Sequence, residues 1–264
     1  MLWFLKIHEH GPLSTSELLA FSDDGKQNKG RAQNRLTDLF NEDNNAHGKP
    51  YLLRPPQQFQ TIDARYNELV YTLSPAGEQA LKDANLWSEW VHKAGGPFWH
   101  QRETAQFMAG VELACLHDPK HNFIPASQIL ERAQTTLRYP TTYTDPYTGQ
   151  RLVKDLIPDG LFGIEFVRDD GKFYRFHCVE IDRGTEPKTS PNKERKSLER
   201  MVLQYEDYIG NKRYQEHLGL RAPMIAIVAL SQPESTELDS FKITKSSTEL
   251  SYVKSEKFNT LVYA

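Results

Sequence analysis

Three carboxylates are spaced so that they can meet at one end of a predicted β-hairpin. Asp159 precedes the first strand, and Glu180 and Asp182 lie near the end of the second, at residues 172–182. Side chains two apart in a strand point to the same face, and the turn at residues 169–171 folds the strands together. Like charges held this close repel unless something neutralises them, and a hard divalent cation is the usual solution.

The simpler interpretation is a solvated hairpin rim, because acidic residues are common at strand ends. Three features together favour the metal site over this alternative: the Pro158-Asp159 start, the Glu-x-Asp end and the basic amphipathic segment that follows.

These residues resemble the PD-(D/E)xK nuclease fold, in which Asp159 and Glu180 would hold the metal that activates water. Residues 158–160 followed by residues 180–186 resemble more closely the plasmid replication-relaxation family, which includes the MobC-type relaxases. The resemblance implies an α/β domain with a central mixed sheet, like that of restriction endonucleases, and Mg²⁺ or Mn²⁺ as the cofactor.

The chain departs from the nuclease motif at one position. Asp182 stands where the motif has lysine, so the usual cation is missing there. Lysine is a flexible point charge on a long stem, so Lys196, further along the chain, is expected to supply that charge. Lys196 or Arg183 would then offset the charge that develops in the transition state.

A predicted helix at residues 99–116 contains one anomalous residue. Glu112 falls inside its apolar stripe, and a buried carboxylate is costly unless it is paired, hydrogen-bonded or bound to metal. The alternatives are a side chain that reaches solvent and one that meets an arginine in the core. Because the nuclease fold often brings an acid from its first helix to the metal, the resemblance makes Glu112 a fourth candidate ligand.

The amino-terminal part, residues 1–84, has the pattern of a winged helix-turn-helix domain. Helices are expected at residues 2–10, 17–21 and 29–40, and wing strands at 51–54 and 68–73. Ser74 then provides an N-cap, with Pro75 at the first position of another helix. The end of this wing closely resembles that of winged-helix regulators.

The third of these helices is the expected DNA-binding element. Basic residues occur without an acid between positions 25 and 37, and Arg and Asn have the right hydrogen-bonding groups for base edges and phosphates. A solvated helix face is the alternative, and many winged helices bind protein instead. The expected DNA-binding residues are Lys26, Lys29, Arg31, Asn34 and Arg35.

Length and composition fit a two-domain protein that works inside the cell. The 264 residues allow a linker at residues 85–98 and a nuclease-like domain at 99–264. The net charge of −3 means that nucleic-acid affinity must come from local basic patches. The two isolated cysteines fit a reducing cytoplasm, and no apolar run approaches the ~18 residues of a membrane span. We therefore expect a cytoplasmic protein without a membrane partner.

The attacking group is left open between water and a tyrosine. Tyr174 shares a strand face with Glu180, whereas Tyr205 falls on the apolar face of a helix and is expected to pack in the core. Residues 139–149 are expected to form a loop. Its three tyrosines, at positions 139, 143 and 147, either stack on single-stranded DNA or anchor the loop.

We therefore predict a DNA-binding, metal-dependent nicking enzyme of a plasmid or mobile element, active in mobilisation or replication initiation. Its partners would be double-stranded or locally melted DNA at an origin-like site and accessory proteins of a relaxosome. The principal rival is a DNA-binding initiator or regulator whose nuclease domain has lost activity, which Asp182 supports. A third interpretation makes the second domain an interaction module.

Overall fold

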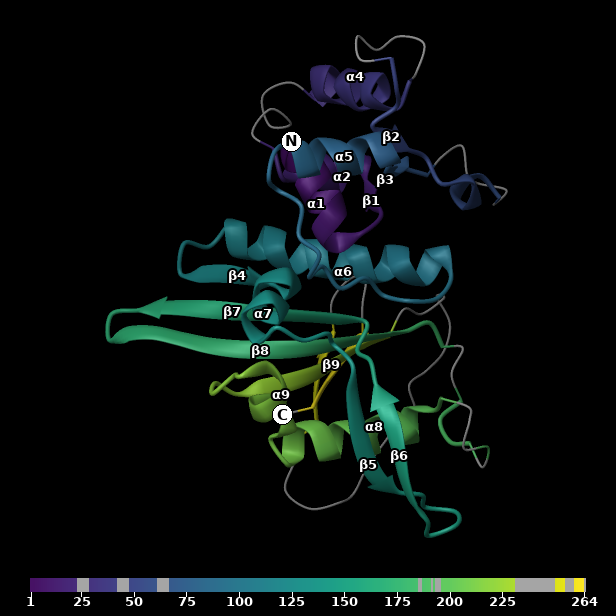
Figure 1. Cartoon of the computed structure of the whole chain (residues 1–264), viewed down its shortest axis with the longest axis vertical. Coiled ribbons are helices and arrows are strands. Elements are labelled where there is room, and N and C mark those ends of the chain that lie inside the picture. The colour runs from purple at the N-terminus through teal and green to yellow at the C-terminus, as the bar shows by residue number, and fades with distance from the viewer. Residues whose placement is uncertain are drawn as a thin grey trace. The chain divides into compact units, whose positions relative to one another are not determined.

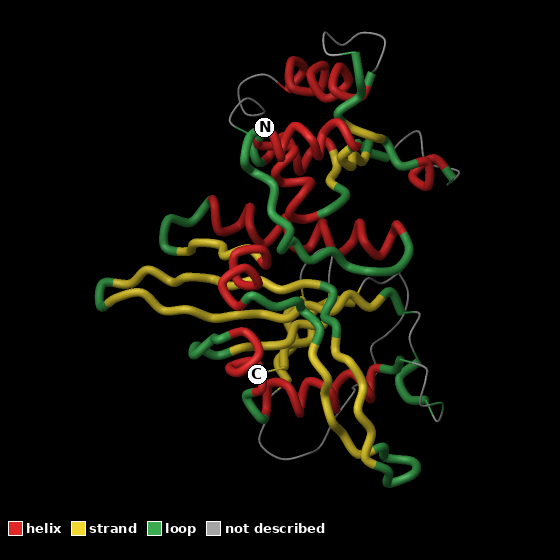
Figure 2. The backbone as a smooth tube through the Cα atoms, in the orientation of Figure 1, coloured by secondary structure: helices red, strands yellow, loops and turns green. Residues whose placement is uncertain are grey.

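The computed structural model comprises two compact units, Met1–Phe123 and Ile124–Ala264 (Figures 1 and 2). It describes residues 1–22, 29–41, 48–60, 67–184, 187–190, 192, 196–230, 250–254 and 259–263. The expected boundary lay at residues 85–98, but the units divide after Phe123. The reason is that helix α6 (Phe98–Leu116) packs on α1, α2 and β1 of the first unit.

The first unit has the helix and strand order expected from its sequence. Ser14 caps α2 in a capping box with Glu17. Ser74 caps α5 with Pro75 at the first helical position, as predicted. Its antiparallel sheet has the order β1-β3-β2, with Leu52 opposite Leu73. The described elements before α6 are α1 (Leu2–His10), β1 (Leu13–Ser14), α2 (Thr15–Ala20), α4 (Lys29–Phe40), β2 (Leu52–Leu53), a 3₁₀-helix η1 (Pro56–Phe59), β3 (Val70–Leu73) and α5 (Pro75–Asp83).

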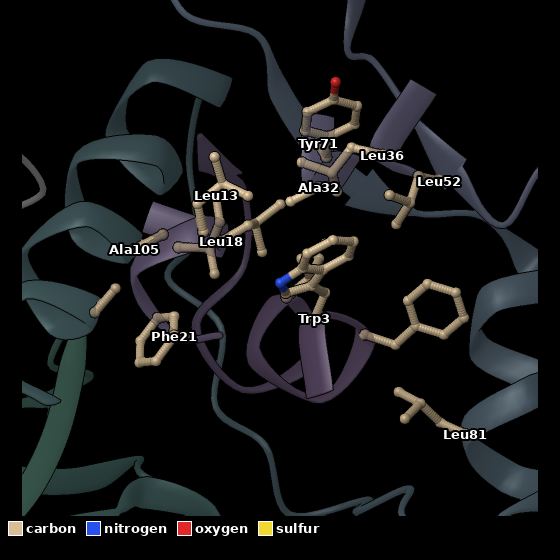
Figure 3. Packing of buried hydrophobic residues seen from close by; sticks show 14 residues of the cluster. Trp3, Leu13, Leu18, Phe21, Ala32, Leu36, Leu52, Tyr71, Leu81 and Ala105 are labelled. Atoms are coloured by element: carbon tan, nitrogen blue, oxygen red, sulfur yellow. The ribbon is translucent and has the colours of Figure 1, made fainter. Parts of the chain in front are cut away.

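One apolar cluster holds these elements together. Trp3, Leu18 and Leu36 come from α1, α2 and α4, and their side chains gather in the same core (Figure 3). Leu18 and Leu36 have no exposed surface. Ala105 of α6 belongs to the cluster as well, which is why α6 is part of this unit.

The second unit is built on a mixed six-stranded sheet. Its order is β10-β11-β9-β8-β7-β4, with β8 parallel to β9 and antiparallel to β7. The predicted central mixed sheet is therefore confirmed. The sheet's strands are β4 (His121–Pro125), within which the two units divide, β7 (Gly160–Arg168), β8 (Gly171–Asp182), β9 (Met224–Leu230), β10 (Leu250–Lys254) and β11 (Asn259–Tyr263).

Helices and a separate ribbon complete this unit. α8 contacts the ribbon formed by β5 and β6, and α7 contacts β7. These elements are α7 (Ala126–Ala133), β5 (Tyr139–Thr144), β6 (Arg151–Leu156), α8 (Leu198–Tyr205), a π-helix η3 (Glu206–Gly210) and α9 (Arg213–Leu218).

The loop predicted at residues 139–149 is instead largely strand β5. Its Tyr and Thr side chains favour extended backbone, and β6 supplies the hydrogen-bonding partner. Pro140 is tolerated because a two-stranded ribbon consists only of edge strands. No helix among the described residues is long and apolar enough to cross a membrane.

Candidate functional site

The end of β8 brings together two of the three carboxylates predicted to converge. Asp159 directly precedes β7, whose first residue pairs with Val179, so Asp159 lies beside the end of β8. Its Oδ2 accepts a hydrogen bond from the Ile181 amide at 2.9 Å. The Asp159 charge also raises the pKa of Glu180, so the two carboxylates interact electrostatically.

Glu180 is the buried centre of the site. It is 2% exposed, and both of its carboxylate oxygens have partners. The Tyr205 hydroxyl donates to Oε1 at 2.7 Å, and Lys196 Nζ donates to Oε2 at 3.0 Å. Burial raises the pKa of Glu180 to about 7; Lys196 opposes this shift and Asp159 adds to it. The carboxylates of Asp159 and Glu180 and the ammonium group of Lys196 thus interact electrostatically at the end of β8.

Helix α8 positions both partners of Glu180. Lys196 directly precedes the N-cap Ser197, whose Oγ accepts from the Arg200 amide. Tyr205 is the last residue of α8, and its buried ring is 2% exposed, as its place on the apolar face predicted. Sequence reasoning missed its hydrogen bond to Glu180. The available signal was general: a buried tyrosine hydroxyl normally finds a polar partner.

The third predicted carboxylate makes a local turn. Asp182 is half-buried, and its Oδ1 accepts from the Gly184 amide at 2.9 Å. Arg183 follows directly and is also half-buried, while residues 185 and 186 of the motif lie outside the described residues. The described residues contain no group of three or more His, Cys, Asp or Glu side chains arranged to hold a metal.

Asp159 and Glu180 nevertheless suit a divalent ion bound by two carboxylates. Mg²⁺ is commonly held by one or two carboxylates, with waters and substrate phosphates as the other ligands. The mutual repulsion of the two acids is the feature that such an ion would relieve. Lys196 now neutralises Glu180, so an ion bound there would share this carboxylate with the ammonium group.

The predicted fourth ligand, Glu112, belongs to the first unit and has its own partners. Lys6 Nζ donates to its Oε1, and His10 Nε2 bonds its Oε2 at 2.6 Å. Burial alone would raise the pKa of Glu112, but the bonds and charges of His10 and Lys6 hold it below its ordinary value. Lys6 and His10, rather than the arginine considered as an alternative, therefore account for this buried acid.

The predicted DNA-binding side chains lie on the outer face of α4. Ala32 and Leu36 are buried, which turns the intervening polar side chains outward. Lys26 lies outside the described residues. The other four are exposed: Lys29, Arg31, Asn34 and Arg35.

The tyrosines considered as nucleophiles or stacking groups are engaged elsewhere. Tyr174 is six residues from Glu180, roughly 20 Å along an extended strand, and donates to Glu165 at 2.7 Å, which raises its pKa. Tyr143 is buried, Tyr139 packs against Tyr208, and Tyr147 donates to a glutamate of α8. These three tyrosines therefore anchor residues 139–147 to the rest of the second unit.

Comparison with known proteins gives one family match. The model of the family described as replication-relaxation matches residues 4–222, most of the chain and both units. No curated protein and no solved structure has significant similarity to the chain.

Proposed function

Because the chain belongs to the replication-relaxation family, we propose that it binds DNA of a plasmid or mobile element and nicks one strand. In this proposal, the first unit is a winged helix that recognises double-stranded or locally melted DNA at an origin. The second is a PD-(D/E)xK-like nuclease domain that uses Mg²⁺ or Mn²⁺. The protein would act in mobilisation or replication initiation, as MobC-type relaxases do, with accessory proteins of a relaxosome.

The first unit supports the DNA-binding half of the proposal. The hairpin of β2 and β3 follows α4, which is the order of a recognition helix and its wing. α4 presents Lys29, Arg31 and Arg35 to solvent, and its described part contains an acid only at Asp38. Phosphate contacts from such residues supply affinity, and contacts of Asn34 and arginine with base edges supply specificity.

One observation carries the nuclease half: a buried Glu180 that interacts with Asp159 and is neutralised by Lys196 at 3.0 Å. In the proposal, these residues stand for the two acids and the cation of the nuclease motif, with the lysine supplied from outside strand β8. The geometry thus supports a migrated lysine that compensates for Asp182.

Each residue has a defined part in the proposed reaction. Asp159 and Glu180 would hold the ion, which when bound polarises the phosphate and lowers the pKa of the attacking group. The pKa of about 7 belongs to Glu180 without an ion, and binding of the ion would require its ionised form. Lys196 and Arg183 would offset charge on the phosphate. Water is the proposed nucleophile, because burial raises the pKa of Tyr205 well above its ordinary value.

A thermal melt with and without Mn²⁺ tests the ion site without requiring the DNA target. An ion that binds only the folded state raises the melting temperature. We expect a rise in wild type that is lost in Asp159→Asn and Glu180→Gln. Asp182→Asn, two residues further along the same strand face, is the matched control and should keep the rise. Nicking of supercoiled plasmid DNA should follow the same pattern.

A DNA-binding initiator without cleavage activity is the second candidate. It is favoured by the 2% exposure of Glu180 and by the partners on both of its oxygens, which an ion would have to share. In that case Mn²⁺ would not change the melting temperature, and Asp159→Asn would leave function intact. Arg31→Glu with Arg35→Glu would abolish DNA binding under either candidate.

A further inference from the structure

The β7–β8 hairpin extends beyond its neighbour β9, and the proposed nuclease site does not use this extension. β9 pairs with β8 only from Phe176 onward, so residues 171–175 lie beyond the last β9 partner. The opposing residues on β7 are 164–168. Figure 1 shows this end of the hairpin extending past β9. We name residues 164–175 the ribbon tip.

One face of the ribbon tip combines aromatic rings with arginines. Phe166 and Phe173 are directly opposite each other in the register, so their rings share a face. The Arg168 guanidinium lies over the Phe173 ring at 5.0 Å, and that of Arg175 over the Phe166 ring at 5.9 Å. Phe173 is 43% exposed. An exposed ring beside two arginines offers the stacking surface and the positive charge that single-stranded nucleic acids require.

The opposite face has a different character. Glu165 accepts hydrogen bonds there from Lys172 at 3.0 Å and from Tyr174 at 2.7 Å. The only carboxylate within the paired strands of the ribbon tip is thus turned away from the arginines and neutralised. Asp169 and Asp170 lie in the turn, where their negative charges repel a polyanion. The surface that favours a polyanion is therefore the face that carries Arg168 and Arg175.

We propose that the Phe166–Phe173 face of the ribbon tip binds single-stranded DNA, with bases stacked on the rings and phosphates bound by Arg168 and Arg175. Stacking on an aromatic ring needs an unpaired base, whereas duplex bases are already stacked on one another. The two arginines provide the charge complementarity. The inference rests on the proposed function only in taking DNA as the ligand, and it assigns the strand exposed by melting or nicking to this ribbon.

The test is fluorescence anisotropy with a labelled oligo-dT, which has no duplex form and no target sequence. Phe173→Ala should weaken binding roughly 5- to 150-fold, the usual effect of removing one stacking ring. Arg168→Gln with Arg175→Gln should weaken binding and reduce its salt dependence, since each lost phosphate contact lowers the slope.

Two matched controls lie on the opposite face. Tyr174 is 40% exposed, nearly the same as its neighbour Phe173, so Tyr174→Ala removes a similar exposed ring from the same strand. Lys172→Gln removes a cation from the same ribbon. Both controls should leave oligo-dT binding unchanged. Equal losses in variants of both faces, no loss in Phe173→Ala, or no binding by wild type would overturn the proposal.

The outcome is separable from that of the nuclease proposal. Asp159→Asn lies outside the ribbon tip, so it should remove the Mn²⁺ effect while oligo-dT binding persists. Phe173→Ala should do the reverse. A variant that loses oligo-dT binding but keeps the Mn²⁺ effect on the melting temperature is altered only in the ribbon tip. A variant that loses the Mn²⁺ effect but still binds oligo-dT is altered only in the ion site.

Discussion

Replacing Glu180 with glutamine should change how stability depends on pH. Burial raises the pKa of Glu180 from 4.5 to about 7. The unfolded chain therefore releases this proton near pH 4.5 and the folded chain near pH 7. Between those values the folded state binds more protons, so stability falls as pH rises. At ~1.4 kcal/mol per pKa unit, ionisation of the buried Glu180 lowers the free energy of unfolding by about 3 kcal/mol, most of it between pH 5 and pH 8.

Glutamine cannot ionise, and its carbonyl oxygen can still accept the hydrogen bond from Tyr205. The free energy of unfolding, measured by urea titration at a series of pH values, should thus shift in favour of Glu180→Gln by about 2 to 3 kcal/mol between pH 5 and pH 8. The comparison with wild type cancels the titration of groups that do not interact with Glu180. Parallel curves for Glu180→Gln would refute the account of the buried carboxylate.

Three further stability measurements test other parts of the fold. Burial, aided by Arg175, lowers the pKa of His177 from 6.5 to about 4. The stability that His177 contributes by staying neutral is therefore complete above pH 6.5 and is lost as the pH falls toward 4. His177→Gln should reduce the fall in the free energy of unfolding between pH 6.5 and pH 4. An unchanged fall in that range would contradict the burial argument. Glu112→Gln removes a buried charge from its two partners and should cost about 3 kcal/mol in urea unfolding, whereas a neutral effect would mean that the pair is not buried. Gly77→Ala should destabilise the fold, because the new Cβ would lie 2.4 Å from the Tyr51 carbonyl oxygen. Gly110→Ala lies on an open helix surface and should stabilise the fold by about 0.5–1 kcal/mol. A change of the same sign in both variants would refute the packing argument.

Local sequence signals were sufficient to place many of the elements. The helix at residues 29–40 and the Ser74 cap with Pro75 each depend on neighbours within a few residues. Capping, periodicity and turn chemistry act over that range, so they can be read along the chain. Residues 139–144 were predicted wrongly because strand formation there depends on β6, a partner that the local composition does not reveal.

Residue types alone identified the acids and the candidate cation Lys196, but not the partners Lys6, His10 and Tyr205. Asp159 and Glu180 were found from strand spacing, and Glu112 from its place in an apolar stripe. Which cation meets which acid depends on contacts between residues far apart in the chain. Glu112 is 102 residues from His10, and Glu180 is 25 residues from Tyr205.

The sequence by itself thus determined the helix and strand pattern, the hairpin with acids at its end and the basic face of α4. Only the tertiary structure decided that Glu112 is satisfied in the first unit and that Lys196 and Tyr205 meet at Glu180. The physical reason is that burial and charge pairing are properties of the packed chain. A carboxylate acquires its pKa and its partners only when folding removes it from water.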